Sequence, residues 1–174
     1  MQIPIIISLV LSATTLPSIS PTTQQELFQQ SNSISFFKSK NTLKSIYLQS
    51  NKNHTFYCGC SFDTNKQIDH DSCNYSPRIK SNKRSHRLEF EHIVPAHALG
   101  KNLQCWKKPI CEKRNGKKYK GRKCCSKISD EYKQMQSDMH NLFPAVGEVN
   151  GDRSNFIFGE IYGEERKYGQ CDFE

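Results

Sequence analysis

The chain has 174 residues, a length that suits one domain with its own hydrophobic core and excludes an array of several domains. Lys and Arg number 25 against 17 Asp and Glu, and the net charge of +8 indicates a polyanionic partner, most often nucleic acid or an anionic membrane. A basic surface that serves only solubility has the same composition, so the arrangement of the charges matters more than their sum.

The N-terminus has the pattern of an export signal. Residues 3–13 form a short apolar run, and small and turn-forming residues follow through Ser20. This run is too short to span a bilayer, and no later stretch is long and apolar enough to do so. We therefore expect a signal peptide over residues 1–20 and a single exported domain over residues 21–174, in the periplasm or secreted. Because no Lys or Arg follows Met1, a buried N-terminal strand is the alternative.

Two segments of the mature chain have clear periodicities. Residues 22–49 place large apolar side chains close to helical spacing, which predicts one or two amphipathic helices that pack on the core. Residues 55–60 are β-branched and aromatic before a Cys-Gly-Cys sequence, which predicts a strand held by disulfides. The polar residues that follow, through Tyr75, predict a loop.

The chain has eight cysteines, an even number that predicts up to four disulfides in an exported protein. Sequence alone leaves their pairing open. A zinc site is the weaker interpretation, because neither Cys-Gly-Cys nor Cys-Cys has the gap that usually separates paired zinc ligands. The cysteines are Cys58, Cys60, Cys73, Cys105, Cys111, Cys124, Cys125 and Cys171.

Positive charge is concentrated in the middle of the chain. Residues 78–87 contain five Lys or Arg and no acid, residues 101–127 contain eleven against one acid, and residues 148–174 contain seven acids and three bases. Gly116 and Gly121 break any long helix in the second block, which we expect to be an irregular loop held by disulfides. A fixed basic loop suits a nucleic-acid backbone. The residues predicted to bind nucleic acid are Arg84, Arg87, Lys107, Lys108, Arg114, Lys117 and Lys118.

A further helix is expected over residues 129–139. Ser129 is a suitable N-cap, and two acids follow it in the first turn, where they favour a helix. Beyond this helix, residues 147–155 are dense in side chains that ligate metals or form hydrogen bonds. A loop or capping role is the preferred interpretation for three of them, Asp152, Ser154 and Asn155.

The stretch Leu88–Ala96 combines two carboxylates, an imidazole and a proline in an apolar frame, directly after the first basic run. An acid beside a histidine can hold a hard metal ion and take a proton from water. Because neighbouring residues on a strand point to opposite faces, Glu91 and His92 reach one site only where the strand bends or ends, and Pro95 is consistent with an end nearby. A zinc protease fits poorly, because the spacing H-x-x-E-x-x-H matches neither of its usual motifs.

Six motifs follow one another along the chain: Tyr57–Cys60, Glu89–Ala96, Cys105-Trp106, Asp138–Leu142, Gly147–Asn155 and Tyr168–Cys171. Over about residues 33–173 the chain resembles the endonuclease I family of exported bacterial nucleases. The resemblance implies an α+β fold, mainly helical with a small antiparallel sheet and a ββα-metal motif, stapled by disulfides. It also implies a metal-dependent, non-specific endonuclease that hydrolyses phosphodiester bonds of DNA and RNA as a monomer and leaves 5′-phosphate ends.

In that family a histidine deprotonates the attacking water, while an adjacent glutamate and a helix-borne asparagine hold one magnesium ion. The resemblance therefore implies His92 as the general base, and Glu91 and Asn141 as ligands of one Mg²⁺, with Mn²⁺ or Ca²⁺ as alternatives. Glu89 matches a motif position and is expected to support catalysis. The chemistry agrees, because a neutral imidazole activates water and a divalent ion neutralises the phosphoryl oxygens and the leaving group.

The chain departs from the family pattern before Cys111, where relatives usually carry an arginine that assists the phosphate. Residues 107–110 read Lys-Lys-Pro-Ile here, so Lys108 or Arg114 is expected to replace that contact, although a lysine lacks the bidentate fork of arginine. Met135-Gln136 stands where relatives often have an acid.

Two other functions remain open on the sequence. One is a disulfide-stapled cationic protein that binds nucleic acid or damages membranes without catalysis, which predicts binding without turnover. The other is a hydrolase of phosphomonoesters, whose pocket would not need so long a basic patch.

Overall fold

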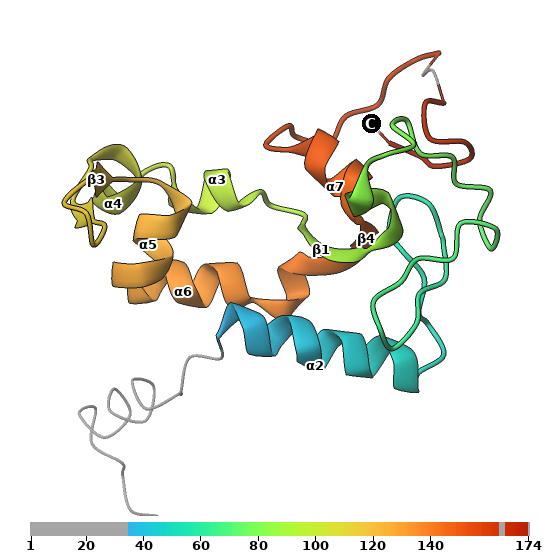
Figure 1. Ribbon diagram of the computed structural model, residues 1–174, viewed down its shortest axis with the longest axis horizontal. Coiled ribbons are helices and arrows are strands. Elements are labelled where there is room, and N and C mark those ends of the chain that lie inside the picture. The colour runs from blue at the N-terminus through green and yellow to red at the C-terminus, as the bar shows by residue number, and fades with distance from the viewer. Residues whose placement is uncertain (1–34, 164–165, 174) are drawn as a thin grey trace, which may run out of the picture. The chain divides into compact units, whose positions relative to one another are not determined.

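The computed structural model describes residues 35–163 and 166–173 (Figure 1). The predicted signal peptide, the domain boundary at residue 21 and the start of the first predicted helix lie outside these residues. The described chain contains six α-helices, two 3₁₀ helices and four strands. They are α2 (Phe36–Gln49), η1 (Lys83–His86), β1 (Leu88–His92), α3 (Ala96–Gly100), α4 (Gln104–Lys107), β2 (Cys111–Glu112), β3 (Lys118–Tyr119), α5 (Arg122–Ile128), α6 (Asp130–Ser137), η2 (Met139–Asn141), β4 (Leu142–Val146) and α7 (Gly147–Arg153).

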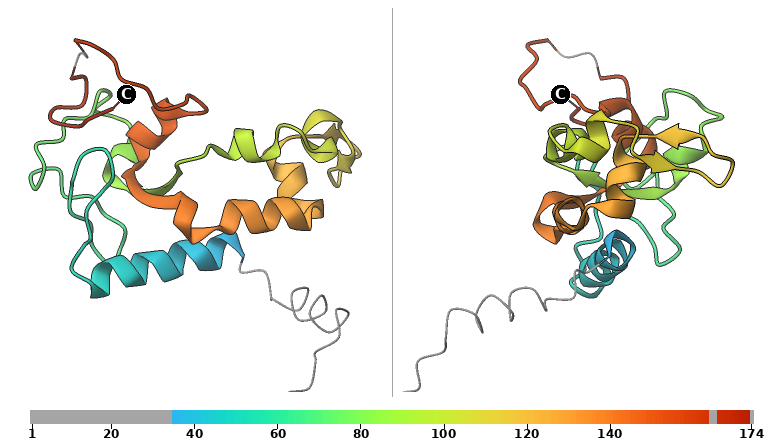
Figure 2. Two further views of the ribbon diagram at one scale, coloured as in Figure 1. Left: turned by 180° about the vertical axis from the view of Figure 1, so that it is seen from behind. Right: turned by 90° about the vertical axis from the view of Figure 1, so that its left-hand side faces the viewer.

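Helices α2 and α6 lie side by side (Figures 1 and 2). Ser35 caps α2 by accepting the backbone N–H of Lys38, and the described part of the predicted N-terminal helix is confirmed. The fully buried Ser39 allows the close approach of the two helices, and its hydroxyl donates to the backbone carbonyl of Ser137 over 2.7 Å. Helix α6 begins as predicted after its N-cap Ser129.

Strand β1 pairs antiparallel with β4, and α7 follows β4 without an intervening loop. The register places His92 opposite Leu142 and Leu88 opposite Val146, and all four residues are buried. Helix α7 packs back against β1. These three elements form the ββα unit that the resemblance implied, and the helices and small sheets confirm the α+β fold.

The predicted strand over residues 55–60 is wrong. The backbone N–H of Gly59 donates to the carbonyl of Thr55, which turns the chain back on itself, and Gly59 has a φ of +68° that suits a turn. The segment is held by disulfides, as expected, and the isolated bridge between His54 and Ser61 joins the residues that flank it.

Residues 101–127 do not form the irregular loop that the sequence predicted. They contain α4, the β2–β3 hairpin and most of α5. The two glycines act as predicted at the ends of these short elements, since Gly116 has a φ of +78° in the hairpin turn and Gly121 a φ of +85° at the start of α5. Local pairing of a few residues satisfies backbone groups that a long open loop would leave to solvent.

The cysteines form four disulfides and none is free, so the disulfide interpretation is confirmed. Each bridge contributes about 2–4 kcal/mol in a chain of modest hydrophobic content. One hydrophobic core surrounds the β1–β4 sheet and includes three buried cysteines. A second core surrounds Tyr132 and includes four. The pairs are Cys58–Cys171, Cys60–Cys73, Cys105–Cys125 and Cys111–Cys124.

Among the described residues, none of the helices has the length and apolar character needed to cross a membrane.

Candidate active site

His92 is the last residue of β1 and is 5% exposed. Its Nε2 lies 2.9 Å from the backbone carbonyl oxygen of Gln136 in α6, and its ring centroid lies 5.2 Å from that of Phe36 in α2. A carbonyl only accepts hydrogen bonds, so this contact assigns the proton to Nε2 in the neutral ring. Nδ1 then carries the lone pair that a general base needs.

The surroundings of His92 keep its imidazole neutral. Burial, and to a smaller extent the positive charges of Arg122, Arg153 and Lys40, lower the pKa of His92 to about 4, against the opposing effect of the Gln136 carbonyl. At neutral pH the ring is therefore ready to accept a proton.

This shift predicts a pH-dependent contribution of His92 to stability. Because the folded pKa of about 4 lies below the ordinary value of 6.5, the unfolded chain binds more protons between these values. The contribution is present above pH 6.5 and is lost as the pH falls towards 4, by about 3 kcal/mol. Urea unfolding of the oxidised, metal-free protein measures this effect. Between pH 7 and pH 4 the wild-type protein should lose about 3 kcal/mol more of its free energy of unfolding than His92→Asn does.

His54→Asn supplies the control, because it removes an exposed histidine and leaves the buried surroundings of His92 unchanged. Parallel stability curves for wild type and His92→Asn would contradict the assignment of a depressed pKa to His92.

Glu91 lies next to His92 in the chain but contacts a different element. Its side chain is 2% exposed, and Oε1 accepts a 2.6 Å bond from Nη1 of the buried Arg153 in α7. Glu91 Oε2 and the Tyr57 hydroxyl are both buried and outside hydrogen-bond geometry, but they are close enough to change each other's pKa. Burial raises the pKa of Glu91 to about 7, while Arg153 opposes this rise.

Arg153 also fixes the end of β1. Its Nη1 donates to the backbone carbonyl of His92 over 2.8 Å, and its Nη2 donates to that of Ile93 over 2.7 Å. The strand ends here, as the sequence predicted, but the side chains of Glu91 and His92 keep the opposite directions of a strand. Glu91 meets α7, whereas His92 meets α2 and α6.

Asn141 lies at the end of η2, directly before β4. Its Oδ1 accepts the backbone N–H of Val94 over 2.7 Å, and its Nδ2 donates to the Val94 carbonyl over 3.1 Å. The amide therefore fastens the chain beyond β1 to the start of β4. The role of Asn141 as a metal ligand stays a prediction.

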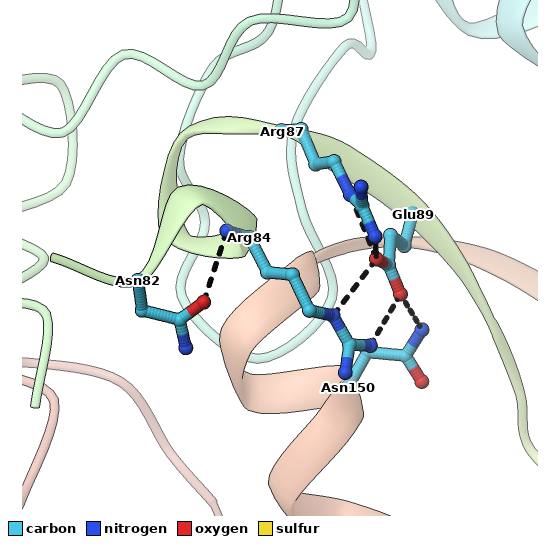
Figure 3. Close-up of polar contacts among 5 residues, drawn as sticks. All are labelled: Asn82, Arg84, Arg87, Glu89 and Asn150. Atoms are coloured by element: carbon cyan, nitrogen blue, oxygen red, sulfur yellow. Dashed lines mark hydrogen bonds and ion pairs between the residues drawn. The ribbon is translucent and has the colours of Figure 1, made fainter. Parts of the chain in front are cut away.

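Glu89 of β1 is the centre of a polar cluster that also includes an arginine of η1, the C-cap arginine of that helix and Asn150 of α7 (Figure 3). Its Oε1 accepts from Nε of Arg84 over 3.0 Å and from Nε of Arg87 over 2.9 Å, and its Oε2 accepts from Nη2 of Arg84 over 2.6 Å and from Nδ2 of Asn150 over 2.9 Å. Burial alone would raise the pKa of Glu89, but the two arginines hold it below its usual value. Arg84 and Arg87, predicted to bind nucleic acid, thus bind this carboxylate.

A cavity of about 770 Å³ opens beside this cluster. Phe36 and Gln136, which both contact His92, line its wall. The remaining charged and amide side chains that face it are Lys40, Lys66, Arg87, Glu89, Arg122, Lys123 and Asn150.

Two residues of this site were missed by sequence reasoning. Arg122 is one of eleven cations in its block, and only the fold places it near His92. Asn150 belongs to the motif over residues 147–155, and its spacing of three from Arg153 on a helix was a usable signal that both side chains face β1.

The other predicted nucleic-acid contacts do not line the cavity. Lys107 ends α4, Lys118 begins β3 and the rest lie between these two elements, all of them exposed. Lys118 forms an ion pair with Glu112 in the hairpin. The exposed cations of this region are Lys107, Lys108, Arg114, Lys117 and Lys118. No group of three or more His, Cys, Asp or Glu that could hold a metal occurs within residues 35–163 and 166–173.

Comparison with known proteins identifies the family of the chain. The model of the Endonuclease I family matches residues 17–173. An extracellular deoxyribonuclease of Aeromonas hydrophila is 48% identical over 120 residues, which cover 67% of this chain and 47% of the relative. A periplasmic deoxyribonuclease of the same species is 48% identical over 120 residues, which cover 67% and 45%. Endonuclease-1 of Buchnera aphidicola subsp. Acyrthosiphon pisum is 39% identical over 158 residues, which cover 84% and 58%. The chain thus spans about half the length of these relatives.

Proposed function

Because the chain belongs to the Endonuclease I family, we propose that it is an exported, monomeric endonuclease that hydrolyses phosphodiester bonds of DNA and RNA with little sequence preference. The observation that carries this proposal is a neutral, buried His92 beside a cavity lined by cations. The names of the relatives, extracellular and periplasmic deoxyribonuclease, support both the substrate class and the export.

His92 is the proposed general base. Gln136 holds Nε2–H, which leaves the Nδ1 lone pair to take the proton of the attacking water. The same carbonyl stabilises the imidazolium that forms, because Nε2 remains a donor to it. A positioned base of this kind accelerates hydrolysis by about 10²–10⁴-fold.

Arg122 is the proposed replacement for the arginine that the family carries before Cys111. It lies on the cavity wall, within the electrostatic environment of His92, and it makes no ion pair within the described chain. A guanidinium offers the bidentate geometry that Lys108 lacks, and Arg114 lies outside the cavity.

The family implies one divalent metal ion, which we propose to be Mg²⁺. An acid and an amide oxygen suit this ion, because it keeps several of its waters and needs few protein ligands. Glu91 Oε2 is buried without a partner, and Asn141 Oδ1 has one lone pair beyond its bond to Val94. Asn150 is the stronger amide candidate, since it lines the cavity and its Oδ1 accepts no hydrogen bond from the described residues. Once bound, the ion supplies Lewis-acid stabilisation of the phosphoryl and leaving oxygens.

Metal removal provides the direct test. Purified protein with Mg²⁺ should degrade supercoiled plasmid and single-stranded RNA to ends that carry 5′-phosphates, and excess EDTA should stop both reactions until Mg²⁺ is restored. Calorimetric Mg²⁺ titrations of Asn141→Ala and Asn150→Ala, each with Asp substitution as a rescue, identify the amide ligand. Undiminished cleavage in EDTA would contradict the proposal that the reaction requires a metal ion. DNA binding without turnover would favour the alternative of a non-catalytic cationic protein.

A further inference from the structure

Three cations converge on one wall of the cavity. Lys40 Nζ lies 4.5 Å from the centroid of the Phe36 ring, and Arg122 Cζ lies 5.4 Å from the same centroid. Lys66 Nζ reaches the same helix, since it donates to Oδ1 of Asn41 over 3.4 Å. Lys40, Lys66 and Arg122 all line the cavity.

No acid neutralises these three side chains. Within the described residues none of them forms an ion pair, and helix α2 contains no Asp or Glu. Glu89, the acid on the cavity wall, is already bound by Arg84 and Arg87. Burial lowers the pKa of Lys40, and the nearby charges of Lys66 and Arg122 lower it further, against a smaller opposing effect of Glu89. A bound anion would relieve this repulsion.

The backbone of Lys66 adds an independent observation. Its φ is +66°, a left-handed conformation that asparagine and glycine tolerate and a lysine adopts at a cost. Two backbone hydrogen bonds hold it there: its N–H donates to the Asp63 carbonyl and its carbonyl accepts the N–H of Leu88, the first residue of β1. A strained residue that brings its charge to a cavity is more typical of a binding site than of a solvated loop.

We propose that Lys40 and Lys66 form a subsite for a nucleic-acid backbone phosphate next to the scissile one. This inference rests on the proposed nuclease function and deepens it, because neither lysine belongs to the basic runs of the sequence. Arg122 contacts the scissile phosphate and His92 activates the attacking water, and the contacts of both residues with Phe36 connect the reacting centre to this subsite. The substrate strand therefore passes along α2 and the loop before β1.

Equilibrium binding of a fluorescent single-stranded oligonucleotide in EDTA tests the subsite without turnover. The variants are Lys40→Gln and Lys66→Asn, alone and together, with Lys38→Gln as the control, an exposed residue of the same helix that does not line the cavity. Each lost phosphate contact reduces the slope of log K against log salt by about 0.7, so the double variant should lose about 1.4 in slope and bind about 25-fold more weakly at 0.1 M salt. Lys38→Gln should bind like wild type.

Lys66→Asn separates binding from folding. Asparagine suits the left-handed backbone, so the melting temperature should stay equal or rise while affinity falls. Wild-type slopes in both single variants, or an equal loss in Lys38→Gln, would overturn the subsite even if plasmid cleavage is intact. Failure of the wild-type protein to bind or cleave any nucleic acid would instead overturn the proposed function, and the subsite with it.

Discussion

His92→Ala is expected to lower the rate of plasmid cleavage by a factor of about 10²–10⁴, because it removes the group that takes a proton from the attacking water. Binding of DNA in EDTA should change little, since the ring is 5% exposed and lies behind the cationic wall. Single-turnover cleavage at saturating Mg²⁺ measures the chemical step apart from binding.

Two companions make the His92 result interpretable. His92→Asn retains a side-chain donor towards the Gln136 carbonyl but carries no base. It should therefore be as inactive as His92→Ala but unfold at a higher temperature than His92→Ala. His140→Ala removes an exposed histidine and should cleave at the wild-type rate. Added imidazole should restore part of the activity of His92→Ala. Cleavage by both His92 variants within a few-fold of wild type would rule out this residue as the base.

Arg153→Met is expected to reduce the free energy of unfolding by about 3–5 kcal/mol, because it leaves the buried Glu91 carboxyl without its partner, so that this group either bears an unpaired buried charge or binds a proton. It also removes the donors to the backbone carbonyls of His92 and Ile93, so the end of β1 loses its attachment to α7. Urea unfolding with the disulfides intact measures the loss. Cleavage should fall as well, since the position of His92 depends on the same attachment.

Arg78→Met is the matched control, because Arg78 forms an exposed ion pair with Asp152 of the same helix α7. Its effect on stability should be a small fraction of that of Arg153→Met. The double variant Glu91→Gln/Arg153→Met should recover part of the stability, since it no longer buries an ionisable carboxyl without its arginine. An Arg153→Met protein as stable as Arg78→Met would show that the buried pair does not hold β1 to α7.

The sequence identified the elements that carry local signals. Ser129 and the acids after it located the start of α6, and the acid–histidine pair before Pro95 located the end of β1. The eight cysteines predicted the disulfides but not their partners, because pairing depends on which loops the fold brings together. The strand expected over residues 55–60 failed for a local reason, since Gly59 and the bridged Cys58 and Cys60 favour a turn over extended pairing.

The group of cations that lines one wall of the cavity, Lys40, Lys66 and Arg122, could not be predicted from the sequence. Charge density favoured the runs around Arg84 and Lys117, but Arg84 binds Glu89, and Lys117 lies on a hairpin away from the cavity. Lys40 is one of three lysines on a helix without acids, and Lys66 stands among acids, so neither segment has the charge density of the two basic runs. Only the packing of α2 beside the β1 region brings these two lysines together. Whether a single Lys or Arg pairs with an acid depends on its tertiary neighbours, which the local sequence does not show.

The bridge between Cys58 and Cys171 closes most of the described chain into a covalent ring. Every residue assigned to the reacting centre lies within that ring, between the two bridged cysteines. A protease that cuts one exposed loop there opens the ring but releases no fragment, because both new ends remain joined through the sulfur atoms. A protein that meets foreign proteases outside the cell can therefore be nicked once and still keep its strands, its helix and its histidine on a single molecule.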